Sequence, residues 1–192
     1  MSNEITPRTH KRKLLLLMLL MGAPIILSYL LYFLGTPSGS VNYGELMETK
    51  PLPEAILHRI DNTSFSINQL RGKWVLLVID SGVCEESCRK KLYYMRQVRL
   101  SQKTEMQRIE RVLLIDDDRI PEINIEKEFK GTWLINAKNN KLLGAIPAKV
   151  SQHDHIYVID PLGNLMMRFP KDVDPSLMLK DLKRLLKISQ IG

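Results

Sequence analysis

Two cysteines are the residues of this sequence best able to do chemistry, and they lie four positions apart. Cys84 and Cys88 are the only cysteines among 192 residues, within the segment "SGVCEESCRKK". Residues at i and i+4 share one face of a helix, so both sulfurs can reach one small object. Two thiolates select copper(I), and a histidine can complete a three-coordinate site as the third ligand. The same two sulfurs can instead form a disulfide. The residues alone leave a copper(I) site, a redox pair and two buried thiols as alternatives.

A strand followed by a helix is predicted around this pair. Residues 74–79, "WVLLVI", form an apolar run of strand length, which is typical of a central strand buried on both faces. Residues 85–102 favour a helix. Its apolar face continues from the two cysteines and comprises Cys84, Cys88, Leu92, Met95 and Val98. The pair therefore lies at a helix N-terminus, where unpaired N–H groups favour thiolate over thiol.

The later elements complete the order of a thioredoxin fold. The sequence predicts a strand at residues 111–115, a helix around 123–130 and a hairpin of residues 155–160 and 165–169 around the turn "DPLGN". Asp174 then caps a last helix that has Pro175 at its first position. This order predicts an α/β, thioredoxin-like domain over residues 60–192, preceded by one transmembrane helix.

The transmembrane helix is predicted from an uncharged apolar segment. Residues 14–34, "LLLLMLLMGAPIILSYLLYFL", give roughly 30 Å of helix, enough to cross a bilayer. A cleavable signal peptide has a shorter apolar region, so we interpret the segment as an uncleaved anchor. Basic residues crowd its N-terminal side, so the positive-inside rule places residues 1–13 in the cytoplasm. Residues 35–59, rich in Pro, Gly and Ser, predict a linker to a domain on the other side of the membrane.

The charge of the chain does not indicate a nucleic-acid partner. Of the formal net charge of +7, the tail 1–13 supplies four basic residues and one acid, Glu4. The rest of the chain has no basic stripe interleaved with aromatic residues, so we expect no nucleic acid to bind. A mitochondrial import sequence is Arg-rich and poor in acids, which the tail with Glu4 is not. We therefore expect a bacterial inner membrane and a periplasmic domain, in a compartment where disulfides form.

The segments "GKWVLLVIDSGVCEESC" and "HDHIYVIDPLGNLMMRF", on an anchored chain, together resemble the Sco (SenC-like) family. The resemblance covers most of residues 60–188 and implies a thioredoxin fold and copper handling during cytochrome c oxidase assembly. Partners would be oxidase subunits or other assembly factors. In that family the two motif cysteines and a histidine before the "DP-x-G" strand bind copper, which implies Cys84, Cys88 and either His153 or His155 as copper(I) ligands. We favour His153, whose spacing from the turn is closer to that of the family.

This sequence departs from the Sco pattern around the motif. The usual prolines after each cysteine are replaced by Glu85 and Arg89, and the expected aromatic residues by Ile79 and Ser81. Three functions therefore stay open. The first is copper(I) binding and delivery. The second is thiol–disulfide exchange, in which Cys84, expected to be the more exposed sulfur, attacks and Cys88 resolves the mixed disulfide. The third is a scaffold that kept the fold and lost the chemistry.

Other candidate ligands are assigned structural roles. Adjacent strand residues point to opposite faces, so Met166 and Met167 cannot chelate copper together, and we expect both to pack. The acidic run of residues 116–118 lacks the spacing of a calcium loop and predicts a solvated loop. His58, in the predicted linker, and His10, in the tail, are not expected to bind metal.

Overall fold

The structure is a computed structural model that describes residues 7–34, 42–121, 123–189 and 191. It divides into two units, Met1–Val41 and Asn42–Gly192, which we describe separately. The first six residues of the predicted tail and residues 35–41 of the predicted linker lie outside the described residues.

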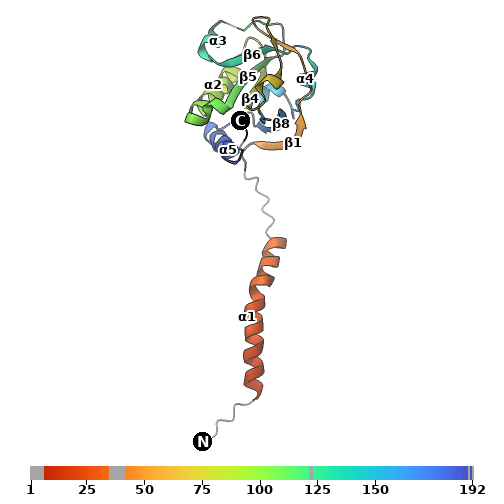
Figure 1. The fold of residues 1–192 in the computed structure, drawn as a ribbon, viewed down its shortest axis with the longest axis vertical. Helices are drawn as coiled ribbons and strands as arrows, with labels where there is room; N and C mark the ends of the chain where they lie inside the picture. Colours follow the sequence, from red (N-terminus) through yellow and green to blue (C-terminus); the bar gives the residue numbers. More distant parts are fainter. Residues whose placement is uncertain (1–6, 35–41, 122, 190, 192) are drawn as a thin grey trace. The chain divides into compact units, whose positions relative to one another are not determined.

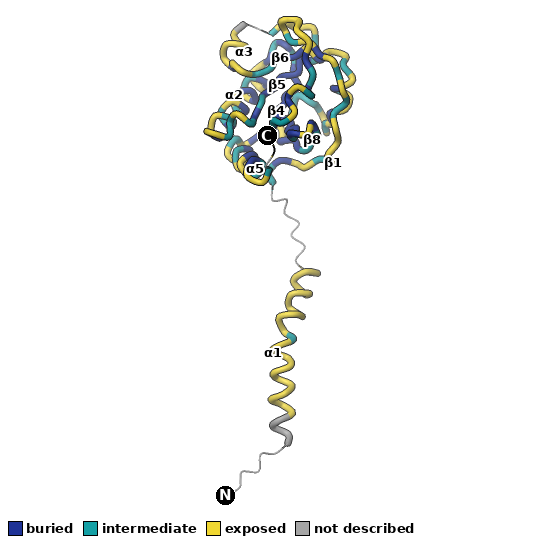
Figure 2. The backbone as a smooth tube through the Cα atoms, in the orientation of Figure 1, coloured by how far each residue is buried: buried dark blue, intermediate teal, exposed yellow. Residues whose placement is uncertain are grey.

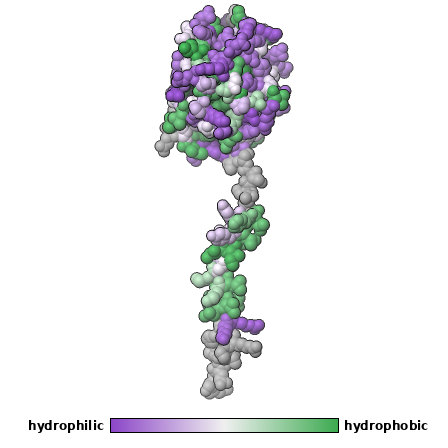
Figure 3. Space-filling view, turned by 90° about the vertical axis from the view of Figure 1, so that its right-hand side faces the viewer, coloured by the Kyte–Doolittle hydropathy of each residue, from purple (hydrophilic) through white to green (hydrophobic). Residues whose placement is uncertain are grey.

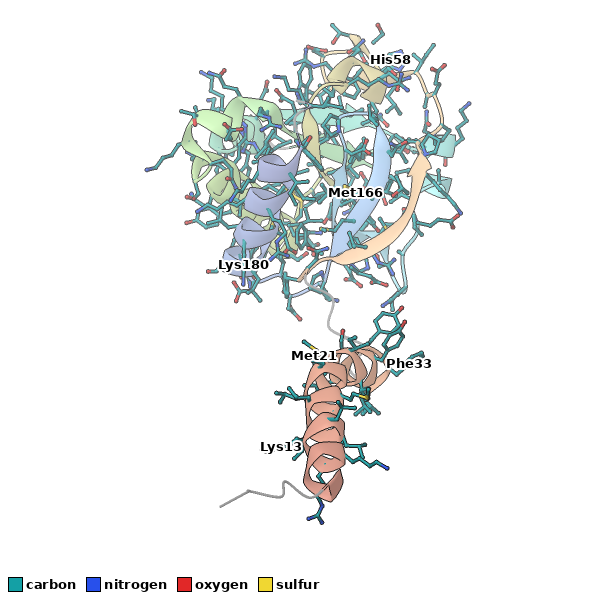
Figure 4. All side chains as sticks on the ribbon, turned by 60° about the horizontal axis from the view of Figure 1, so that its bottom comes forward. Lys13, Met21, Phe33, His58, Met166 and Lys180 are labelled. Carbon is teal, nitrogen blue, oxygen red and sulfur yellow. A yellow bond between two sulfur atoms is a disulfide. The ribbon has the colours of Figure 1, made fainter. Side chains whose placement is uncertain are left out.

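The first unit contains one long helix, α1, Pro7–Leu34 (Figure 1). The predicted anchor lies wholly inside it. Its segment Lys11–Leu34 has a mean hydropathy of 2.5, and none of its apolar window is buried against other residues. The described surface of α1 is mainly hydrophobic in Figure 3, and Figure 4 shows Met21 and Phe33 projecting away from the helix axis. By length and composition, α1 is able to cross a membrane.

Within the described residues, eight strands form the single sheet of the second unit, in the order β1-β8-β7-β4-β5-β6-β2-β3. The strands are β1 Glu45–Pro51, β2 Leu57–Arg59, β3 Ser64–Phe65, β4 Trp74–Asp80, β5 Ile109–Ile115, β6 Thr132–Asn136, β7 Ile156–Ile159 and β8 Asn164–Phe169. Strands β4, β5 and β6 are parallel, whereas β7, β8 and β1 on one side and β2 and β3 on the other pair antiparallel. The predicted strands and the hairpin are confirmed.

Helices flank this sheet. They are α2 Glu86–Leu100, α3 Ile123–Glu128, α4 Lys141–Gly144 and α5 Pro175–Ile188, with short 3-10 helices η1 Ile67–Leu70, η2 Lys103–Arg108 and η3 Gln152–Asp154. Helix α2 contacts β4, β5 and α5, so α2 and α5 lie together on one side of the sheet (Figure 1). The predicted cap of α5 is confirmed, because the carboxylate of Asp174 accepts hydrogen bonds from the backbone N–H groups of Ser176 and Leu177.

The core has two layers, one on each face of the sheet. All seven residues of β4 are buried, as expected for a central strand, and Figure 2 shows the buried residues concentrated along the central strands. Side chains of α2 and α5 share one apolar cluster with Cys84 and Cys88. The opposite face is covered by residues of η1 and by Leu142 of α4. The predicted α/β, thioredoxin-like arrangement is therefore confirmed.

The boundary of the domain differs from the prediction of a linker over residues 35–59. Strands β1 and β2 lie in that range and belong to the sheet, so the compact unit begins at Asn42. Long-range contacts hold this segment: the buried N–H of Gly44 donates to Asp181 Oδ2 at 2.8 Å. Composition misled the prediction because β1 is an edge strand with mostly exposed side chains, which has no apolar alternation to reveal it.

An ion pair attaches β1 to its neighbour. Glu45 stands opposite Arg168 of β8, and Arg168 Nε lies 3.0 Å from Glu45 Oε2. Hydrogen bonds from Arg168 and Lys149 lower the pKa of Glu45 from 4.5 to about 2. A lowered acid pKa contributes stability that is present above the ordinary value and is lost as the pH falls towards 2.

We expect Glu45→Gln to remove this pH-dependent contribution. The melting temperature of the full chain in detergent should be lower for the variant at neutral pH, and the difference from wild type should shrink between about pH 5 and pH 2. The effect should be modest because the Glu45 side chain is 47% exposed, which lets solvent screen the pair. Glu48→Gln is the matched control, since Glu48 pairs with Lys50 of the same strand. A difference that persists at pH 2 would contradict the assignment.

Candidate functional site

The two cysteines lie in the turn that joins β4 to α2. Cys84 precedes the helix, and its N–H donates to Ser81 O at 3.0 Å, whereas Cys88 is the third residue of α2. Cys84 has a φ of 47°, a left-handed conformation that is uncommon for a residue other than glycine. The two residues form a disulfide with a Cα–Cα distance of 5.0 Å. The backbone therefore brings the two sulfurs together, as the i and i+4 spacing required.

Both cysteines are buried. Each is 0% exposed, and they share an apolar cluster with Leu92 and Met95 of α2 and with Phe129, which follows α3. The expectation that Cys84 would be the more exposed sulfur is therefore wrong. Cys84 packs into this apolar cluster although it precedes the helix, and the segment after β5 packs onto the same turn at Ser81 and Gly82.

Asp117 attaches this segment to residues 81–85, the turn between β4 and α2 that we call the cysteine turn. Its carboxylate accepts hydrogen bonds from Ser81 Oγ at 2.6 Å, from the Gly82 N–H at 2.9 Å and from the Arg119 N–H at 3.1 Å. Burial alone would raise the pKa of Asp117, but these hydrogen bonds hold the pKa below its ordinary value. The Arg119 carbonyl lies against Gly82 so closely that a Cβ at Gly82 would sit 1.8 Å from its oxygen. Residues 116–119 therefore form a cover over Ser81 and Gly82 of the cysteine turn.

The sequence predicts a solvated loop for the acidic run of residues 116–118, but in the structure each of its carboxylates contacts another part of the protein. Asp116 faces His153, Asp117 binds the cysteine turn and Asp118 pairs with Lys138. The three carboxylates thus have three different protein partners. Among the described residues, no group of three or more His, Cys, Asp or Glu side chains is arranged to hold a metal ion.

The two candidate histidines have different neighbours. His153, in η3, has its Nε2 2.7 Å from Asp116 Oδ2 and its Nδ1 3.8 Å from Asp80 Oδ1. His155 Nδ1 lies 2.8 Å from the carbonyl oxygen of Phe169, in β8. The His153 side chain is 41% exposed and is turned towards carboxylates in this disulfide state. His58 lies on β2, which the sheet order separates from β4 by two strands (Figure 4).

A buried ion pair next to the motif was not predicted. Lys91 is 5% exposed and Asp80 is 6% exposed, and Lys91 Nζ lies 2.9 Å from Asp80 Oδ2. The same ammonium group donates to the backbone oxygen of His153. The sequence did carry a signal, because Asp80 ends an otherwise apolar strand and Lys91 lies next to Leu92, a member of the apolar face of α2. The sequence alone, however, did not show that the side chains of Asp80 and Lys91 form an ion pair.

A cavity of about 370 Å³ opens beside the cysteine turn. Its walls include Glu86, Ser87 and Tyr94 of α2, His153 of η3, and Lys171 and Val173 of the loop before α5. A side chain or segment of a partner can therefore approach the first turn of α2, although the two sulfurs themselves are covered.

The donor set fits copper(I) only after reduction. In the disulfide state each sulfur is bonded to the other, and the His153 ring faces Asp116. Reduced Cys84 and Cys88 would provide two soft thiolates, which suit copper(I) rather than a hard cation. Met167 is buried in the core and Met166 is partly buried on β8, in accord with packing roles.

The comparisons with known proteins agree with this fold. The model of the family described as "Transmembrane-like, thioredoxin-like, C-terminal domain" matches residues 74–189, which is more than half of the chain. The chain belongs to this family. No curated protein matches the chain in sequence.

Solved structures extend the likeness. Yeast Sco1 with copper bound has a TM-score of 0.61 at 12% identity, covering 74% of this chain and 96% of that one. BsSco, described as a member of the Sco family of cytochrome c oxidase assembly proteins, has a TM-score of 0.55 at 11% identity, with 76% and 99% covered. The thioredoxin domain of a thiol-disulfide oxidoreductase from Bacteroides vulgatus has 0.53 at 19%, with 73% and 99% covered. The expected resemblance to Sco proteins is confirmed at the level of the fold.

Proposed function

We propose that this chain is a membrane-anchored thiol–disulfide protein that assists cytochrome c oxidase biogenesis. The observation that carries the proposal is the Cys84–Cys88 disulfide in the turn between β4 and α2. Two sulfurs held at this separation can pass between dithiol and disulfide without a large change of the backbone. The role in oxidase assembly is supported by the likeness to BsSco, and that in thiol exchange by the likeness to the Bacteroides vulgatus oxidoreductase.

In the proposed reaction the reduced chain gives two electrons to a disulfide of its target. The Cys84 thiolate attacks one target sulfur, a mixed disulfide forms, and the other target sulfur leaves as a thiolate. The Cys88 thiolate then attacks Cys84 Sγ, which closes the intramolecular disulfide and releases the target with both cysteines reduced. A thiol reductant from elsewhere must reduce the chain before the next turnover. Because Cys84 is buried, the side chains packed around it must move apart for the attack.

The anchor would place this reaction at a membrane surface. Helix α1 is long and apolar enough to span a membrane. In the proposed arrangement this is a bacterial inner membrane, with the N-terminus in the cytoplasm and the folded unit in the periplasm. The partners would then be oxidase subunits or other assembly factors, whose cysteines are reduced before they receive metal.

Copper(I) binding by the reduced pair is the second candidate function. It is favoured by the position of His153, whose backbone is held against α2 by Lys91, and by the likeness to copper-bound yeast Sco1. Copper(I) would be the cargo, with Cys84 and Cys88 as thiolate ligands and His153 as the third ligand. His153 would first have to leave Asp116, and His155 remains the alternative ligand.

A redox titration and a copper(I) titration of the full chain in detergent test both functions. The wild-type chain should show one two-electron midpoint potential for its cysteine pair in a thiol/disulfide buffer. It should also undergo thiol–disulfide exchange with a disulfide substrate. Cys84→Ala/Cys88→Ala should show neither. Alanine is preferable to serine at these positions, because it buries no hydroxyl group.

The copper titration, made on the reduced chain against a competing chelator, separates the two candidates. One-to-one binding that His153→Ala weakens by about ten-fold or more would support copper delivery. Exchange activity without cysteine-dependent copper binding would support only the thiol–disulfide function. The absence of both exchange activity and copper binding would contradict the proposal and would favour the scaffold function.

A further inference from the structure

The buried ion pair of Lys91 and Asp80 joins three parts of the candidate site. Lys91 lies three residues after Cys88 on α2, Asp80 ends β4, and His153 lies in η3. The ammonium group of Lys91 donates to both Asp80 Oδ2 and the backbone oxygen of His153. The ammonium group of Lys91 therefore links α2, the end of β4 and η3, which is the segment that carries His153.

Asp80 adds two contacts to this link. Its Oδ1 accepts a hydrogen bond from the Ser81 N–H at 3.0 Å, where the cysteine turn begins. The same oxygen faces His153 Nδ1 at 3.8 Å, while Asp116 faces the opposite ring nitrogen. The backbone of His153 is thus fixed by Lys91, and its ring lies between two carboxylates.

Stability alone does not account for such a pair. Burying two charges has a desolvation cost that their attraction often does not exceed, and apolar replacements of buried pairs are frequently neutral or stabilising. Both side chains are less than 10% exposed, so this cost applies here. A geometric role offers a reason for keeping the two charges.

We infer that Lys91 is a positioning residue that, with Asp80, holds His153 beside the cysteine pair. The inference rests on the proposed function for its chemical meaning, because it predicts that Lys91 acts on the copper(I) affinity through His153. It goes beyond that function in assigning a role to two residues that touch neither sulfur nor copper in the proposed site.

A double-mutant cycle on the reduced full chain tests this coupling. Lys91→Met should weaken copper(I) binding by about ten-fold when His153 is present, and by less than about two-fold in the His153→Ala background. Equal losses in both backgrounds would overturn the inference, because a general structural effect does not depend on His153. Asp80→Asn/Lys91→Met is tested alongside, since it leaves no buried carboxylate without a partner.

A second measurement does not depend on copper. The imidazole NMR signals of His153 in the oxidised chain should shift or broaden in both the Lys91→Met and the double variant, while those of His58 stay unchanged. Lys180→Met, the same substitution at an exposed position of α5 (Figure 4), is the matched control and should leave His153 unaffected. Unchanged His153 signals in folded Lys91 variants would overturn the inference. If wild type binds no copper, the proposed copper function fails, and these signals still decide the role of Lys91.

Discussion

Cells whose only copy of this chain carries Cys84→Ala/Cys88→Ala should lose the proposed contribution to cytochrome c oxidase biogenesis completely. Both the thiol–disulfide cycle and the copper(I) site need sulfur at these two positions, and the chain has no other cysteine. Oxidase activity in membranes of the variant strain should therefore fall to the level of a strain without the gene. The measurement is oxidase activity per amount of membrane-bound chain.

The loss should come from chemistry and not from unfolding. A disulfide between residues four apart closes a small loop, and the chain-entropy model gives it at most about 2 kcal/mol of stability. The double variant should thus keep its fold and reach the membrane in normal amounts, which circular dichroism and immunoblotting would verify. Oxidase activity at the wild-type level would contradict both dithiol functions and would favour the scaffold.

Gly82→Ala should have the second largest effect, because it should displace residues 116–119 from the cysteine turn. An alanine Cβ would lie 1.8 Å from the carbonyl oxygen of Arg119 and 2.6 Å from its carbonyl carbon, both of which are backbone atoms. Such a clash cannot be relieved by rotating a side chain, so residues 116–119 must move away from the turn. The move would also break the hydrogen bonds that Asp117 accepts from Ser81 and Gly82.

Two results are expected from Gly82→Ala. Overpacking of this kind costs about 1–3 kcal/mol, which thermal or denaturant unfolding would measure. Small-molecule thiols should also reduce the Cys84–Cys88 disulfide faster, because displacing this segment should loosen the turn that carries Cys84. Gly144→Ala is the matched control, since an added Cβ there meets nothing within 4 Å and the φ of Gly144 is not positive. An unchanged reduction rate in Gly82→Ala would mean that residues 116–119 do not limit access to the sulfurs.

Local sequence patterns were sufficient to predict the central elements. The apolar run that forms β4, the helical stripe of α2 and the capped start of α5 are each encoded within a single element. Periodicity and capping depend on neighbouring residues, so they can be recognised before the fold is known. The spacing of Cys84 and Cys88 likewise indicated that their sulfurs can meet.

Contacts between distant segments could not be predicted in this way. Strand β1 is ordered by β8 and Asp181, which lie more than a hundred residues later, and its own exposed residues carry no pattern. The burial of Cys84 follows from the apolar cluster that it shares with α2 and Phe129, and the partners of the acidic run lie in three other parts of the fold.

The sequence by itself determined the apolar anchor segment, the thioredoxin-like order of elements and a cysteine pair at a strand-to-helix turn. Only the tertiary structure decided that His153 faces Asp116 and that Lys91 joins Asp80 to the histidine segment. The physical reason is that charged side chains have no periodicity of their own. Their partners are set by which strand ends and loops the sheet brings to the same edge.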